Sequence, residues 1–271
     1  MGYMSAKKIN FYTITGLNRN YIQLLLLLIQ QSLTIRYKRS VIGIGWTLLN
    51  PMLTSFILWI VFSFLFAGKL QSGQQFAPYL MAGVLLNSFF QLGLLQSANS
   101  ISGNKNILTK VSVPSRIFAF AAALAAFINF IIGLIPLTIV VYISGQNIEW
   151  TFPIVFLVGL LLAFFVAGIG LFLSIIFIRF EDTVNIVNAL LLMLAALTPI
   201  FYPVDILSKP VKFLVNLNPL TSFLDIFRWS FSDNATVTYA DFLYVVIISF
   251  TSFILGNYFF KKHWPKTIAM L

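Results

Sequence analysis

The 271-residue sequence has no cysteine, and charged residues of either sign are scarce. The absence of cysteine excludes disulfide bonds, cysteine metal ligands and a thiol nucleophile. Charged residues make up 9% of the chain and hydrophobic residues 59%. Soluble domains carry about 25% charged residues, so this composition indicates an integral membrane protein.

Acidic residues are the scarcer kind, with seven Asp and Glu against seventeen Lys and Arg. In a membrane protein this excess reflects the enrichment of basic residues on the cytoplasmic side, and we expect no nucleic-acid partner. The single histidine, His263, lies in a basic tail. A histidine in such a place is more often a solvated surface group than a ligand, so we expect no metal and no cofactor in this chain.

Two kinds of chemistry are also missing. The six long apolar segments have no Asp, Glu, Lys, Arg or His in their interiors. Ion-driven carriers use such residues, and membrane transferases use carboxylates, metals or histidine. The Walker A sequence GxxxxGK[ST] is absent. If ATP drives transport, a separate chain must bind ATP and magnesium. A passive channel, an ion-driven carrier and a membrane-embedded transferase are the alternatives from other classes.

Six segments are long enough to cross a bilayer, which takes about 20 apolar residues. They are residues 46–67, 76–98, 117–143, 152–178, 184–201 and 242–260. Residues 20–39 are too short and too often interrupted to span, which favours an amphipathic helix in the interface. The sequence therefore predicts an all-α integral membrane protein with six transmembrane helices.

We treat residues 1–271 as one transmembrane domain, with an N-terminal segment (1–45), a six-span bundle (46–260) and a C-terminal tail (261–271). With both termini in the cytoplasm, thirteen Lys and Arg residues fall inside and four outside. The positive-inside rule therefore predicts cytoplasmic N- and C-termini, and an even number of spans agrees with this orientation.

The connection at residues 202–241 contains an apolar stretch that Asn218-Pro219 interrupts. Non-helical backbone at membrane depth is tolerated only where protein or water covers it. We therefore expect a re-entrant pair of short helices on the outer face, between spans five and six. The alternative is an amphipathic stretch that lies in the outer interface.

Two motifs carry a resemblance to a known family. The stretch RYKRSVIGIGWTLLNP resembles the N-terminal signature of permease subunits of bacterial type-2 ABC exporters for polysaccharides. The matching residues are Arg36, Tyr37, Lys38, Ser40, Gly43, Trp46 and Pro51. Ile42 replaces the usual Leu. The stretch LNPLTSFLDIFRWSF is similar to a second element of these permeases, through Asn218, Pro219 and Arg228.

The resemblance implies a homodimer in the bacterial cytoplasmic membrane, bound to two copies of an ABC ATPase subunit. Its substrate would be a lipid-linked glycan carried on undecaprenyl diphosphate or a related lipid. Exporters of O-antigen, capsule and teichoic acid share these features. The FRWSF segment is more similar to the O-antigen branch, so we expect O-antigen export, with capsule and teichoic-acid export as alternatives.

The basic cluster before the first span predicts a substrate gate. Arg36, Lys38 and Arg39 can form charge-assisted hydrogen bonds to a diphosphate. Tyr37 lies among them, Gly43 permits close approach of the backbone, and Trp46 suits the boundary between water and lipid. The plainer interpretation is that the basic residues only anchor the inner end of the first span.

Two further groups are candidates for transport functions. The uncharged polar residues Asn87, Gln91, Asn185 and Asn188 are candidates for the translocation path, although polar groups also join helices to one another. We expect the ATPase to contact two inner loops, at Lys105, Lys110, Arg116, Glu181 and Asp182. The alternative is that these loops are solvated connectors.

Overall fold

The computed structural model describes residues 19–37, 42–43, 45–66, 75–108, 113–146, 150–180, 182–231 and 237–268. These residues form helices and connecting turns, with no strand among them. The helices are α1 (Arg19–Tyr37), α2 (Gly45–Phe66), α3 (Phe76–Gly103), α4 (Lys105–Leu108), α5 (Arg116–Ile143), α6 (Ile154–Arg179), α7 (Thr183–Leu197), η2 (Val204–Ile206), α8 (Lys209–Leu217), α9 (Pro219–Trp229) and α10 (Tyr239–Thr267).

Five of these helices, α2, α3, α5, α6 and α10, are long and apolar enough to cross a membrane. The predicted span at 184–201 is instead the 15-residue helix α7, which ends at Leu197. Thr198 is extended, with φ −89° and ψ 131°, because a residue that precedes a proline is disfavoured in helical geometry. Among the described residues the long helices therefore number one fewer than the sequence predicted.

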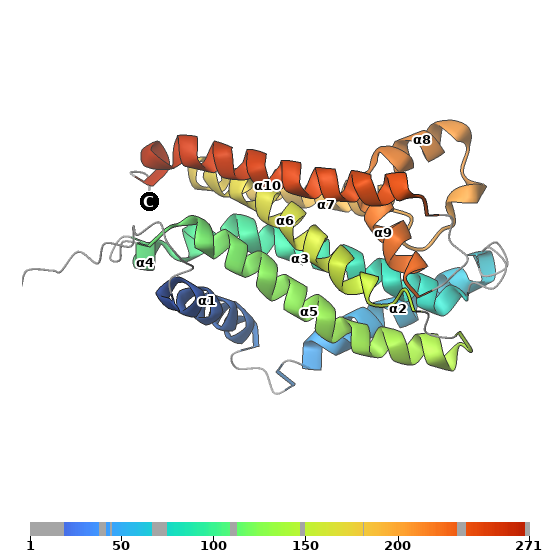
Figure 1. Cartoon of the computed structure of the whole chain (residues 1–271). Coiled ribbons are helices and arrows are strands. Elements are labelled where there is room, and N and C mark those ends of the chain that lie inside the picture. The colour runs from blue at the N-terminus through green and yellow to red at the C-terminus, as the bar shows by residue number, and fades with distance from the viewer. Residues whose placement is uncertain are drawn as a thin grey trace, which may run out of the picture.

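The long helices lie side by side, with α1, α4 and the C-terminus at one end of the bundle and α8 and α9 at the other (Figure 1). Helix α1 is present where an amphipathic helix was predicted, and α4 is a short helix in the connection between α3 and α5. The expected pair of short helices is present as α8 and α9. Their depth in the membrane stays a prediction.

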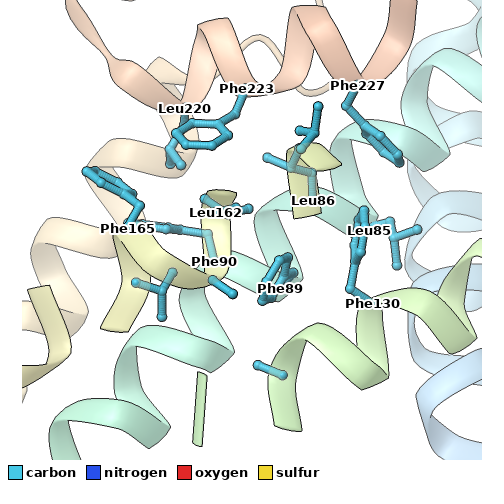
Figure 2. Close-up of a cluster of buried hydrophobic side chains, with 14 of the residues drawn as sticks. Leu85, Leu86, Phe89, Phe90, Phe130, Leu162, Phe165, Leu220, Phe223 and Phe227 are labelled. Carbon is cyan, nitrogen blue, oxygen red and sulfur yellow. The ribbon is translucent and has the colours of Figure 1, made fainter. Parts of the chain in front are cut away.

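The core lies between α3, α5, α6 and α9 and is rich in phenylalanine (Figure 2). The rings of Phe89 and Phe130 lie 5.1 Å apart, and Phe130 lies 5.3 Å from Phe227 of α9. Lipid tails are as apolar as these side chains, so close van der Waals packing has to hold the helices together. The phenylalanine cluster thereby fastens the short helix α9 to three long helices.

Helices α6 and α10 approach each other most closely at two glycines. A Cβ atom on Gly256 of α10 would overlap the carbonyl oxygen of Gly168 on α6. Nearby, Ser252 Oγ donates a hydrogen bond to the carbonyl oxygen of Phe165 at 3.0 Å. Small residues allow this kind of backbone contact in membranes, so the two helices pack as a pair.

We predict that Gly256→Ala destabilises the bundle, because the added methyl group meets backbone that cannot rotate away. Overpacking of this kind typically costs about 1–3 kcal/mol. Gly103→Ala is the matched control, since a Cβ at Gly103 has no neighbour within 4 Å. Thermal unfolding of the purified protein in detergent should show a lower midpoint for Gly256→Ala alone. Equal midpoints for the two variants would contradict the described helix contact.

Candidate functional site

A polar groove lies between α2, α3 and α5 and encloses about 300 Å³. Its polar lining residues are Thr47, Asn50 and Thr54 of α2, Ser88 and Gln91 of α3, and Asn129 of α5. Apolar and aromatic side chains complete its walls, including Trp46, Phe89 and Phe130. The described lining residues are uncharged, so the groove can form hydrogen bonds without holding a ligand by ionic attraction.

Asn129 marks the groove as a place for a hydrogen-bond donor. Its side chain is 7% exposed, and its Oδ1 atom has no hydrogen-bond partner among the described residues. An unsatisfied buried acceptor costs about 1–3 kcal/mol. Rotation of the amide toward the groove would let a hydroxyl group or a water molecule there remove this cost.

The structure brings part of the predicted translocation path to this groove. Gln91 lines it, and Gln91 Nε2 donates to Asn87 Oδ1 at 3.4 Å. Asn185 and Asn188 are exposed on α7 and are not among its lining residues. The structure therefore joins the two candidates of α3 and leaves those of α7 apart.

Four polar groove residues were not predicted from the sequence, namely Thr47, Asn50, Thr54 and Asn129. The first three form a detectable pattern, because they recur at helical spacing along one face of an apolar span. Asn129 is a lone amide in an apolar helix, and only the packing of α5 against α3 shows which way it faces.

The start of α2 positions Trp46 at the groove. Gly43 has φ +57° in the turn before α2, and the Trp46 amide donates to the Gly43 carbonyl at 3.3 Å. Left-handed backbone is strongly disfavoured for residues with a Cβ atom. Gly43 therefore has a role in the chain turn itself, and Trp46, 37% exposed, lies in the first turn of α2 that follows.

The proposed gate residues are only partly placed. Arg36 and Tyr37 lie at the end of α1, but their side chains, and all of Lys38 and Arg39, lie outside the described residues. Their contact with a diphosphate stays a prediction.

The candidates for ATPase contact separate into two kinds. Lys105 is exposed at the start of α4, and Asp182 is exposed in the turn before α7. Arg116 instead donates from Nη1 to Asn257 Oδ1 of α10 at 2.7 Å, so its guanidinium joins α5 to α10. Lys110 and Glu181 lie outside the described residues.

Arg228 of α9 is 4% exposed, and its guanidinium donates hydrogen bonds to three backbone carbonyls. Nη1 donates to the Pro199 carbonyl at 2.9 Å and Nη2 to the Ile200 carbonyl at 2.9 Å. Nε and Nη2 also donate to the Tyr79 carbonyl, at 3.2 and 3.0 Å. The guanidinium lies 3.4 Å from the centre of the Tyr79 ring, so Arg228 connects α9 to α3 and to the break after α7.

The neighbouring motif residues complete this connection. Asn218 caps α9 by accepting from the Leu220 amide at 3.1 Å, and its Nδ2 donates to Thr198 Oγ1 at 2.8 Å. Pro219 is the first residue of α9, a position that suits its fixed φ and missing N–H. The second motif therefore has a structural role within this chain.

Comparisons with known proteins support the family that the two motifs indicate. Residues 23–232 match the family model described as "ABC-2 type transporter". The O-antigen export system permease protein RfbA of Myxococcus xanthus is 28% identical over 220 residues, 79% of this chain and 82% of that protein. RfbA of Klebsiella pneumoniae is 23% identical over 234 residues, 86% and 87% of the two chains. The capsule polysaccharide export inner-membrane protein CtrC of Neisseria meningitidis serogroup B is 24% identical over 254 residues, 92% and 93%.

We predict that Arg228→Lys lowers the free energy of unfolding by about 3 kcal/mol. One ammonium group cannot replace the guanidinium bonds to three carbonyls, and each hydrogen bond to a charged group contributes about 1.5–3 kcal/mol. The control is Lys212→Gln, which removes a surface ion pair to Asp205 with 44% and 65% exposed side chains. Such pairs contribute about 0–1 kcal/mol. Thermal unfolding in detergent distinguishes the variants, and an unchanged midpoint for Arg228→Lys would contradict the described connection.

Proposed function

Since this chain belongs to the ABC-2 type transporter family, we propose that it is the membrane-spanning subunit of an ATP-driven exporter of lipid-linked polysaccharide in the bacterial cytoplasmic membrane. The polar groove is the observation that carries this proposal, because uncharged amide and hydroxyl side chains line a groove in an otherwise apolar bundle. O-antigen is the favoured cargo, since RfbA proteins from two organisms are similar to this chain. Capsule polysaccharide is the second candidate, because the match to CtrC covers 92% of the chain.

The groove has the chemistry that a moving sugar chain needs. Sugar hydroxyls donate and accept hydrogen bonds, and the groove offers Gln91 and Asn129 together with hydroxyl side chains. Each neutral hydrogen bond contributes only about 0.5–1.5 kcal/mol, so a glycan can bind and leave. Trp46 and Phe89 supply flat apolar faces on the same walls.

A second copy of the chain would complete the path. In the most apolar 18-residue stretch of each helix, 11% of the residues are buried in α2 and 72% in α3. In α7 only Val187 and Leu191 are buried. Both helices therefore have large surfaces that a partner copy can cover. In that homodimer α7 and the residues after it serve as the fifth of six spans, and Asn185 and Asn188 face the path.

Orientation follows from the charges at the two ends of the bundle. Lys105 and the α10 residues Lys261, Lys262 and Lys266 lie at the end with α4 and the C-terminus (Figure 1). We assign this end to the cytoplasm by the positive-inside rule. The α8–α9 pair then lies on the outer side as a re-entrant element.

ATP hydrolysis belongs to a separate subunit, which binds ATP and magnesium. Two copies of it contact the homodimer at α4 and at the turn before α7, where Lys105 and Asp182 are exposed. The basic cluster at Arg36, Lys38 and Arg39 binds the diphosphate of the substrate before the glycan enters the groove.

The decisive experiment combines genetics and purification. A strain that lacks this permease should lose surface glycan and regain it with the wild-type gene. The purified chain should carry an ABC ATPase with it, and lipid-linked glycan should stimulate that ATPase. A purified chain that hydrolyses ATP or transfers sugars by itself would exclude the permease function.

We predict that the double change Gln91→Leu and Asn129→Leu lowers export about tenfold, because two groove hydrogen bonds are lost at about 0.5–1.5 kcal/mol each. Surface glycan is measured in the complemented deletion strain, with assembly of the complex checked in parallel. Thr138→Val on α5 is the control, since Thr138 does not line the groove. Normal export by a well-assembled double variant would place the path elsewhere.

We predict that Lys105→Glu weakens co-purification of the ATPase, because the charge reversal lies at the start of α4. Lys209→Glu makes the same change at the opposite end of the bundle, where Lys209 begins α8. Pull-down from membranes should recover less ATPase with Lys105→Glu and a normal amount with Lys209→Glu. Equal recovery would show that the contact does not involve α4.

A further inference from the structure

A second cavity, separate from the polar groove, lies between α1, α3 and α5. It encloses about 330 Å³, and six of its nine lining residues are polar. These six are Gln31, Ser32, Gln96, Asn99, Ser100 and Asn104. The described residues that line it include none with a charge. We call it the amide cavity, because four of the six carry a side-chain amide.

The hydrogen bonds of the amide cavity leave an acceptor unused. Ser100 Oγ donates to the Ser97 carbonyl at 2.7 Å, and Asn104 Nδ2 donates to the Ser100 carbonyl at 2.8 Å. Both donors are thus taken up by the backbone of α3. Gln96 Oε1 is buried and has no hydrogen-bond partner among the described residues, so rotation of this amide toward the cavity would offer an acceptor to a ligand that donates hydrogen bonds.

The contact across the cavity is weak. Gln31 Nε2 of α1 donates to Asn104 Oδ1 at 3.4 Å, beyond the usual 2.7–3.2 Å range for an N–H···O bond. A ligand with several hydroxyl groups can donate to Gln96 and replace this long bond with shorter ones. Helix α1 and the end of α3 would then be joined through the ligand.

We propose that the amide cavity binds one neutral hexopyranose unit of the exported glycan. This inference rests on the proposed function. Amide side chains supply both donors and acceptors for sugar hydroxyls, the volume lies within the usual range of about 300–1,000 Å³ for ligand pockets, and Phe118 contributes an aromatic wall. A phospholipid headgroup fits less well, because no charged residue among the described lining is available for its phosphate.

The position of the cavity suggests what binding does there. Gln91 of the groove and Gln96 of the cavity are five residues apart, which places them about 140° apart around α3. Asn104 follows the last residue of α3 as its C-cap, and its carbonyl accepts from the Ile107 and Leu108 amides of α4. A sugar that binds at Asn104 therefore changes the position of α4, the helix that we expect to contact the ATPase. Occupation of the cavity is thereby coupled to the ATPase.

The test uses the full permease–ATPase complex in phosphatidylglycerol nanodiscs. The probes are the methyl pyranosides of glucose, galactose and mannose, followed by saturation-transfer difference NMR. We expect signal transfer to at least one of them, and an affinity about three- to tenfold lower in Gln31→Leu and Gln96→Leu, the loss expected for one neutral hydrogen bond. Gln30→Leu is the matched control, because Gln30 is the neighbouring residue on α1, is exposed and does not line the cavity.

Ser32→Phe is a second variant, which fills the cavity from α1 without changing α3 and should abolish the transfer. The proposal is overturned if the wild-type complex gives no transfer, or if the cavity variants match Gln30→Leu. It is also overturned if native mass spectrometry of complexes taken from cell membranes shows a phospholipid that only the cavity variants lose. Complementation of the deletion strain is scored separately, so restored surface glycan without sugar binding rejects the cavity site and leaves the proposed function intact.

Discussion

The arrangement of the bundle end that carries α8 and α9 depends on one buried guanidinium. The chain leaves helical geometry after Leu197, because Pro199 forces Thr198 into an extended conformation. Carbonyl groups at such a break need donors that a bilayer does not supply. Arg228 supplies them for Pro199 and Ile200 and also donates to Tyr79 of α3. Gly83 makes room for it, since a Cβ there would lie 3.0 Å from Arg228 Nη2.

The groove and the amide cavity share the same two helices, α3 and α5, as walls. Helix α2 closes one and α1 closes the other. Because the core of α3, α5, α6 and α9 is densely packed with aromatic rings, these shared walls are rigid. The closing helices carry fewer internal contacts, so the shape of either space is set by the position of α1 or α2.

Much of this architecture could be predicted from the sequence, because apolar length and breaks decide where helices form in a membrane. The ends of α2, α5 and α6 fall within two residues of prediction. The fifth span was overestimated, since apolar composition continued past the proline that ends α7. Gln91 was found as a polar residue in an apolar span. Asn129 and Gln96 gain their significance only from tertiary packing, which shows that their side-chain oxygens are buried without a partner in the part of the chain that the structure describes.

The backbone contact between Gly168 and Gly256 divides the bundle into parts that can move and parts that cannot. Two helices whose main chains touch cannot slide past each other without a clash, because no side chain lies between them to change its rotamer. Helices α6 and α10 are therefore expected to move together as one rigid pair. The helices that can shift relative to this pair are α1, α2 and α7, and α1 and α2 are the ones that close the amide cavity and the groove.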